Sequence, residues 1–182
     1  MNTMHRFAFL MLSATAALSA GFAAAAPAPA ATESRIEVSW NPPDELSEVR
    51  QAVRPQRQPP LEWLDKLAAH LRNRADQILP AGERLQVRIT DIKLAGDYEP
   101  WHGPRFDEVR IVKDIYPPRI DLHYVLIGSD GATLREGDAK LRDPAFLSRS
   151  SANDSDSLRY EKRLLDDWLR REFGATQGAR GR

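Results

Sequence analysis

The chain contains no cysteine among its 182 residues. This absence excludes disulfide bonds, thiolate catalysis, cysteine-bound zinc and the lipid-modified cysteine of a lipoprotein. The chain also lacks an excess of either charge, because 26 lysines and arginines balance 26 aspartates and glutamates. A near-neutral protein has no general electrostatic attraction for nucleic acid or for anionic membranes, so neither is expected as a partner.

The familiar motifs of enzyme active sites are missing as well. The sequence contains no Gly-x-Ser-x-Gly, Ser-x-x-Lys or His-Glu-x-x-His motif, no EF-hand loop and no glycine-rich phosphate-binding loop. These absences favour a protein that is not an enzyme, and no cofactor is expected.

The first 26 residues are typical of a secretory signal peptide. His5 and Arg6 precede an uncharged run, and small residues between 23 and 31 offer several cleavage sites. An uncleaved membrane anchor is the alternative, since the run approaches the roughly 20 residues that span a bilayer. The abundance of alanine favours cleavage. We therefore expect a periplasmic or secreted protein without a stable membrane anchor.

Composition divides the remaining chain into three parts. Residues 27–34 are a Pro/Ala-rich tether, residues 35–173 a single folded domain, and residues 174–182 a disordered basic tail. About 150 residues remain after cleavage, which is enough for one domain with a hydrophobic core.

Hydrophobic periodicity predicts the elements of this domain. Alternation of apolar residues predicts strands at 35–40, 84–94, 108–115, 118–128 and 132–141. Apolar residues at three- and four-residue spacing predict helices at 61–78 and 157–173. The order β-α-β-β-β-β-α predicts a single α+β domain, with a mostly antiparallel, curved sheet of about five strands and both helices packed on one face.

Two of these strands change phase along their length. In the strand 84–94 the apolar positions change from odd to even after Ile89. In the strand 132–141 Leu134 faces the core, and the phase changes at Gly137. An extra residue at a β-bulge causes such a shift and bends the strand, so we expect a bulge in each.

Four separated blocks of the sequence resemble a known family. The segments LPAGERLQVRITDIKLAG, PRIDLHYVL, LRDPAF and SLRYEKRLLDDWLRREF resemble domain-of-unknown-function family 3016, found in exported proteins of Gram-negative bacteria. The resemblance covers roughly residues 36–173. The family tends to carry an aromatic–Thr–Asp–Val–Arg sequence where this chain reads Leu46–Ser47–Glu48–Val49–Arg50. Because the family has no assigned activity, the resemblance implies a compartment and a domain but no catalytic residues.

Acidic and aromatic residues gather after the second strand. The candidate binding residues are Asp91, Asp97, Tyr98, Glu99, Trp101 and His102. Together with Asp107 and Glu108, these carboxylates and the imidazole could ligate a divalent metal or act in acid–base chemistry. The alternative is a polar surface loop in which Trp101 folds back over the core.

Three further polar residues are expected to support the fold. Asp91 lies at an apolar strand face, and a buried carboxylate is unfavourable unless it is paired and hydrogen-bonded. Arg119 and Arg159 are its predicted partners. Glu161 lies one turn into the second long helix, where a negative charge interacts favourably with the helix start.

Two functions are compatible with these features. The first is a non-enzymatic periplasmic domain that binds another protein or component of the cell envelope, with Tyr98, Trp101 and Tyr116 as contact residues, because Tyr and Trp concentrate at interfaces. The second is a small divalent-metal-binding protein or metal-assisted hydrolase that uses the acidic 91–108 segment.

Overall fold

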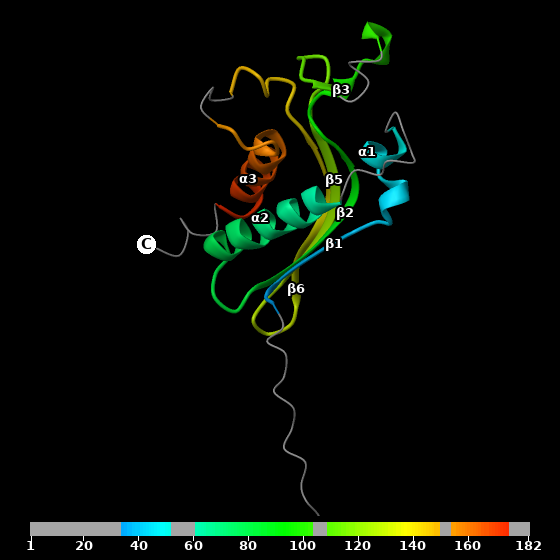
Figure 1. Ribbon diagram of the computed structural model, residues 1–182. Coiled ribbons are helices and arrows are strands. Elements are labelled where there is room, and N and C mark those ends of the chain that lie inside the picture. Colours follow the sequence, from blue (N-terminus) through cyan, green and yellow to red (C-terminus); the bar gives the residue numbers. More distant parts are fainter. Residues whose placement is uncertain (1–33, 52–60, 104–108, 150–153, 175–182) are drawn as a thin grey trace, which may run out of the picture. The chain divides into compact units, whose positions relative to one another are not determined.

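The computed structural model describes residues 34–51, 61–103, 109–149 and 154–174, and a four-stranded sheet lies at its centre (Figure 1). The strand order is β1-β2-β5-β6. β1 (Ile36–Trp40) runs parallel to β2 (Arg84–Lys93). β5 (Arg119–Ile127) pairs antiparallel with β2 on one side and with β6 (Thr133–Arg142) on the other. β3 (Asp97–Tyr98) and β4 (Arg110–Ile111) form a separate two-stranded sheet.

Two long helices, α2 (Glu62–Ile78) and α3 (Arg159–Phe173), lie on the same side of the main sheet (Figure 1). Each buries one apolar stripe and exposes charged residues on the other side. α2 ends where Leu79 turns to an extended backbone, because Leu79 precedes Pro80 and a residue before proline is disfavoured in the helical region. The short helix α1 (Ser47–Arg50), which follows the 3-10 turn η1 (Pro43–Glu45), lies on the other side, beside the upper end of β2.

The hydrophobic core lies between the sheet and the two long helices. β2 and β5 supply buried side chains to it at Leu85, Val87, Ile89, Ile92, Ile120, Leu122, Tyr124 and Leu126. On the helix side, the rings of Trp168 and Phe173 contact Tyr124 edge-on, with ring centroids 5.5 and 5.7 Å away. Full burial of one such large apolar side chain contributes about 1.5–3 kcal/mol, so this layer supplies most of the driving force for folding.

The predicted single α+β domain, with both long helices on one face, is confirmed, but the predicted strand at 108–115 is wrong. Among the described residues of that segment, only Arg110 and Ile111 form a strand, and they pair with β3 outside the main sheet. The apolar residues Val109 and Ile115 stand at positions of the same parity, as on one face of a half-buried strand, yet both are exposed, and so is Val112. The main sheet therefore has four strands instead of about five.

The bulge predicted after Ile89 is confirmed. The pairing of β2 with β5 shifts between Ile89 and Asp91, so that Thr90 is the extra residue. Ile92 then returns to the core opposite Ile120, and Asp91 faces away from the helices opposite Asp121.

The bulge predicted at Gly137 is wrong. Gly137 pairs in regular register with Tyr124, and the shift in β6 lies next to the hairpin turn, where Leu134 is the extra residue. Leu134 is therefore exposed instead of facing the core. Nearly all of β6 is accessible to solvent, with Leu141 its one buried residue.

The two ends of the chain lie outside the described residues. The predicted signal peptide (1–26), almost all of the tether (27–34) and the basic tail beyond residue 174 therefore remain predictions. Within the described ranges, no helix combines the length and the hydrophobicity needed to cross a membrane.

Candidate functional site

The candidate site lies at the upper end of the main sheet, where the chain leaves β2 and returns to β5. We call the described residues of this excursion, 96–103 and 109–116, the arm. The arm contains β3, β4 and the 3-10 turn η2 (Pro100–His102), and it extends beyond the end of the main sheet (Figure 1).

Glu48 of α1 connects the arm to the body of the domain. Its side chain is only 3% exposed. One carboxylate oxygen accepts a hydrogen bond from the Leu94 amide at 3.0 Å and lies 3.5 Å from Lys93 Nζ. The other oxygen forms an ion pair with the Arg110 guanidinium of β4. A single buried carboxylate of α1 thus contacts both β2 and the arm.

Arg110 is itself held by several groups of the arm. It donates hydrogen bonds to the carbonyls of Ala95 and Gly96 at 3.3 and 3.0 Å, and it lies 4.8 Å from the centre of the Tyr98 ring. Burial acts to lower the pKa of Arg110, but the neighbouring Glu48 charge and Tyr98 outweigh burial and raise the pKa above its ordinary value. The guanidinium therefore stays charged and keeps its ion pair.

The two ends of the arm are joined by Glu99. Its buried carboxylate accepts hydrogen bonds from Lys113 Nζ at 2.7 and 2.8 Å and from the Tyr116 hydroxyl at 3.0 Å. The backbone also closes here, because the Gly96 amide donates to the Tyr116 carbonyl at 2.9 Å. Gly96 has a φ of 81°, and a Cβ at this position would lie 2.8 Å from the Ile111 carbonyl oxygen, so only glycine fits.

The partner of Asp91 is not one of the two predicted arginines. Its carboxylate accepts hydrogen bonds from the Ser47 amide at 2.7 Å and from the Ser47 hydroxyl at 2.8 Å. The first amides of a helix have no partner within the helix, so Asp91 satisfies one at the start of α1. Arg159 instead lies 4.3 Å from the centre of the Tyr160 ring and donates to the Asp156 carbonyl.

Glu161 is a fully buried acid on α3. One oxygen accepts a hydrogen bond from the Ala95 amide at 2.7 Å, and the other has no hydrogen-bond partner among the residues that are described. Burial raises the pKa of Glu161 above the ordinary value of a glutamate, and the hydrogen bond from Ala95 opposes this effect. Glu161 thus connects α3 to the chain just before the arm, and the predicted interaction of its charge with the helix start stays a prediction.

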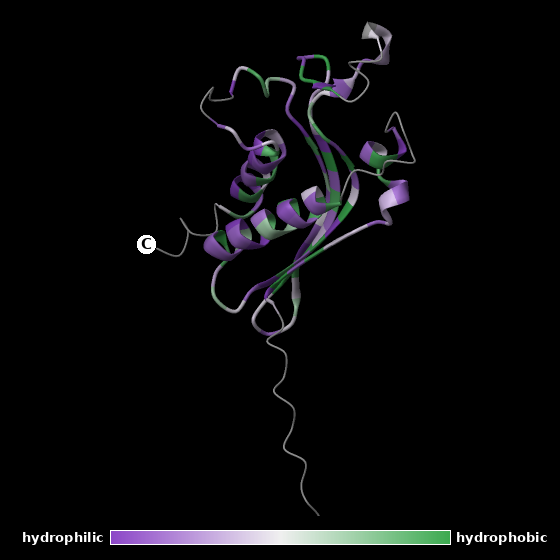
Figure 2. Cartoon of the chain, in the orientation of Figure 1, coloured by the Kyte–Doolittle hydropathy of each residue, from purple (hydrophilic) through white to green (hydrophobic). Residues whose placement is uncertain are grey.

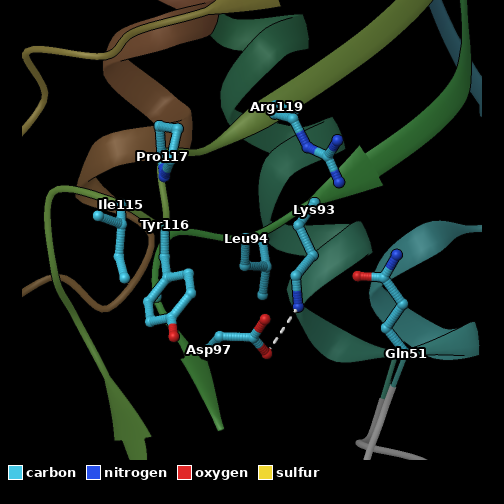
Figure 3. Close-up of a pocket in the computed structure, with 9 residues that line it drawn as sticks. Gln51, Lys93, Leu94, Asp97, Ile115, Tyr116, Pro117 and Arg119 are labelled. Carbon is cyan, nitrogen blue, oxygen red and sulfur yellow. Dashed lines mark hydrogen bonds and ion pairs between the residues drawn. The ribbon is translucent and has the colours of Figure 1, made fainter. Parts of the chain in front are cut away.

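A pocket of about 250 Å³ opens between the base of the arm and the sheet (Figure 3). Its polar lining comes from Gln51, Lys93, Asp97, Tyr116 and Arg119. Lys93 and Asp97 form an ion pair at 3.2 Å across it. The described lining offers charged groups and hydrogen-bond donors, but no histidine or serine that could act as a nucleophile or a general base.

The predicted binding residues separate in the structure into three groups. Asp97, Tyr98 and Glu99 lie on the arm. Tyr98 and Glu99 interact with cations of the arm, and Asp97 interacts with Lys93 of β2. Trp101 is 69% exposed on η2. The side chain of His102, together with Asp107 and Glu108, lies outside the described residues.

A metal site at these acids has no support in the described part of the chain. There, no group of three or more His, Asp or Glu side chains is arranged to hold a metal ion. Asp97 and Glu99 are already paired with lysines, and Asp91 with Ser47.

Sequence reasoning did not single out Ser47 and Glu48 of α1 as site residues. Ser47 and Glu48 fall in a proline-rich stretch without periodicity. The resemblance offered the one signal, since the family tends to carry threonine and aspartate where this chain departs to Ser47 and Glu48. This chain has a hydroxyl and a carboxylate there, and both residues are buried and paired.

The sequence was also compared with protein-family models and with curated proteins. The model described as "Protein of unknown function (DUF3016)" matches residues 34–171. The chain belongs to this family. The match runs from β1 to the last turns of α3, so α1, the arm and the pocket are all parts of the DUF3016 domain. The comparison with curated proteins found no match.

Proposed function

We propose that this DUF3016 protein is an exported periplasmic domain that binds another protein of the cell envelope through its arm and catalyses no reaction. The observation that carries the proposal is the exposure of large apolar side chains on the arm. Trp101, Val109, Val112 and Ile115 are between 39% and 69% exposed. In Figure 2 the hydrophobic colour lies on the loop beside β3, whereas η2 at the far end is pale to purple. Several large apolar side chains exposed on one short part of a protein favour an interaction site.

The anchoring of the arm supports the same proposal. Glu48 and Glu99 are buried and paired with cations of the arm, and Gly96 closes its base. A surface fixed in this way loses little conformational entropy when a partner binds, and preorganisation of this kind increases affinity.

Export rests on the N-terminal sequence. An uncharged, alanine-rich run follows Arg6, and the chain has no cysteine. The full-length protein, expressed in a Gram-negative host, should appear in the periplasmic fraction with a new N-terminus between about residues 24 and 32. An intact N-terminus in the cytoplasmic fraction would contradict this part of the proposal.

Site-specific photocrosslinking in living cells tests the partner. The photoreactive residue p-benzoylphenylalanine replaces Val112 or Ile115 on the arm, and Asp130 in the exposed β5–β6 turn serves as the control position. We expect both arm positions to give a crosslink to one identified envelope protein, and the control to give none. Substitution of Val109 by aspartate should abolish the crosslink, because a charge on the apolar surface opposes burial. Identical products from all three positions, or none from the arm, would refute the proposal.

A further inference from the structure

A row of three positive side chains crosses the upper end of the main sheet. Lys93 of β2 lies directly opposite Arg119 of β5, and Arg119 lies directly opposite Arg142 of β6. Residues that are paired across neighbouring strands project from the same face of a sheet, and like charges in such positions destabilise it. Each of these cations therefore needs a negative partner.

The two outer cations have their partners. Lys93 Nζ lies 3.2 Å from an Asp97 oxygen, and an Arg142 nitrogen lies 2.6 Å from an Asp121 oxygen. The central cation has none: throughout the described residues, no hydrogen bond or ion pair involves the half-buried guanidinium of Arg119.

The neighbouring acids of the described residues all interact with groups other than Arg119. Glu48 and Asp97 carry two negative charges, and Lys93 and Arg110 carry the two positive charges that face them. Asp121 faces Arg142, and Asp91 accepts hydrogen bonds from Ser47, so none of these four carboxylates interacts with the Arg119 guanidinium.

Arg119 lines the pocket of about 250 Å³ at the base of the arm. The side chains of Gln51 and Lys93 line the same pocket and offer further donors (Figure 3). Leu94 and Ile115 add apolar walls. The pocket thus combines a cation that lacks a counterion, nearby donors and an apolar surface.

We propose that this pocket binds one carboxylate carried next to a short apolar group. The Arg119 guanidinium is its main partner, since guanidinium and carboxylate form paired, charge-assisted hydrogen bonds. Gln51 is the second donor, and Leu94 and Ile115 contact the apolar group. A monoanion is favoured over a dianion such as phosphate, because the carboxylate of Asp97 in the same pocket repels a dianion more strongly. The inference does not depend on the envelope partner proposed above.

An NMR titration of the purified protein with N-acetyl-L-leucine tests the site. The uncharged N-acetyl-L-leucinamide and inorganic phosphate are titrated in parallel. We expect N-acetyl-L-leucine to give saturable shifts of backbone amides in 93–97 and 115–119, and the other two probes to bind at least about tenfold more weakly. Arg119→Gln should weaken binding of N-acetyl-L-leucine by about tenfold or more. Arg84→Gln, which removes the same charge from an exposed position at the start of β2, should change it less than about twofold.

The stability of Arg119→Gln separates a binding role from a structural one. Without a ligand, its thermal midpoint should equal or exceed that of the wild type, because the substitution relieves the repulsion along the row. A lower midpoint would mean that Arg119 has a structural counterion, and it would overturn the proposal. No saturable shift, equal binding of the uncharged amide, equal affinity of Arg119→Gln, or tighter binding of phosphate would overturn it as well. The crosslinking result does not affect the NMR titration or the thermal midpoint, so the two proposals are tested independently.

Discussion

Glu48 should be among the most sensitive residues of the domain to a small chemical change. Glu48→Gln keeps the size of the side chain and an oxygen that accepts from the Leu94 amide, but it removes the negative charge beside Arg110 and Lys93. Removing one partner of a buried ion pair destabilises a protein by about 3–5 kcal/mol, because the other charge remains buried.

The surroundings of the two cations favour the lower end of that range. Lys93 keeps its ion pair with Asp97 at 3.2 Å, and the Arg110 side chain is 23% exposed, so water can reach it. We therefore expect a loss of about 3 kcal/mol in the free energy of unfolding. For a domain of this size the thermal midpoint should fall by about 6–12 °C.

Urea and thermal denaturation, followed by circular dichroism, measure the effect. Glu45→Gln is the matched control, because Glu45 is exposed and its side chain only accepts from Asn41 at 3.3 Å, so its change should stay below about 0.5 kcal/mol. Hydrogen exchange should also accelerate at the Gly96 amide if Glu48 holds the arm. A loss below about 1 kcal/mol for Glu48→Gln would refute the conclusion that this carboxylate anchors the arm.

Two further changes test the neighbouring contacts. Because the pKa of Glu161 is raised in the folded state, the folded protein retains a proton that the unfolded chain has already lost, and wild-type stability falls as pH rises through that interval. The thermal midpoint of Glu161→Gln relative to wild type should therefore increase as the pH rises above about 4, where a glutamate of the unfolded chain loses its proton. A constant difference would show that Glu161 does not titrate in this way. Gly96→Ala should destabilise the protein more than Gly131→Ala in urea denaturation, since both glycines have positive φ but only a Cβ at Gly96 meets the Ile111 carbonyl. Equal losses would mean that the base of the arm relaxes around the added methyl group.

The main elements could be predicted because the burial of one face imposes a period on the sequence. The change of phase after Ile89 located the bulge, since the core requires Ile92 to face inward once Thr90 is inserted. The prediction from periodicity failed at Leu134 and in the segment 109–115 for the same reason. The side chains of Leu134, Val109, Val112 and Ile115 are exposed, and periodicity alone does not distinguish an exposed apolar position from a buried one.

The site was predictable only in part. Asp91 stood out because a carboxylate at the end of an apolar strand needs a partner. Ser47 could not be identified as that partner, because it lies 44 residues away in a segment without periodicity. The row through Arg119 became visible only when pairing was known, since it depends on the register of three strands.

The exposed strand β6 affects whether copies of this protein aggregate at high concentration. In the described residues β6 pairs with β5 alone, and an unpaired strand edge is a template on which another chain can add. Along this strand, however, charged side chains occur at Arg135, Glu136, Asp138, Lys140 and Arg142. A second strand that docked there would have to remove these charges from water. In acid, where the two carboxylates are neutralised, the three remaining cations give the edges of two copies the same sign, so resistance to edge-to-edge aggregation persists when the acidic partners are lost.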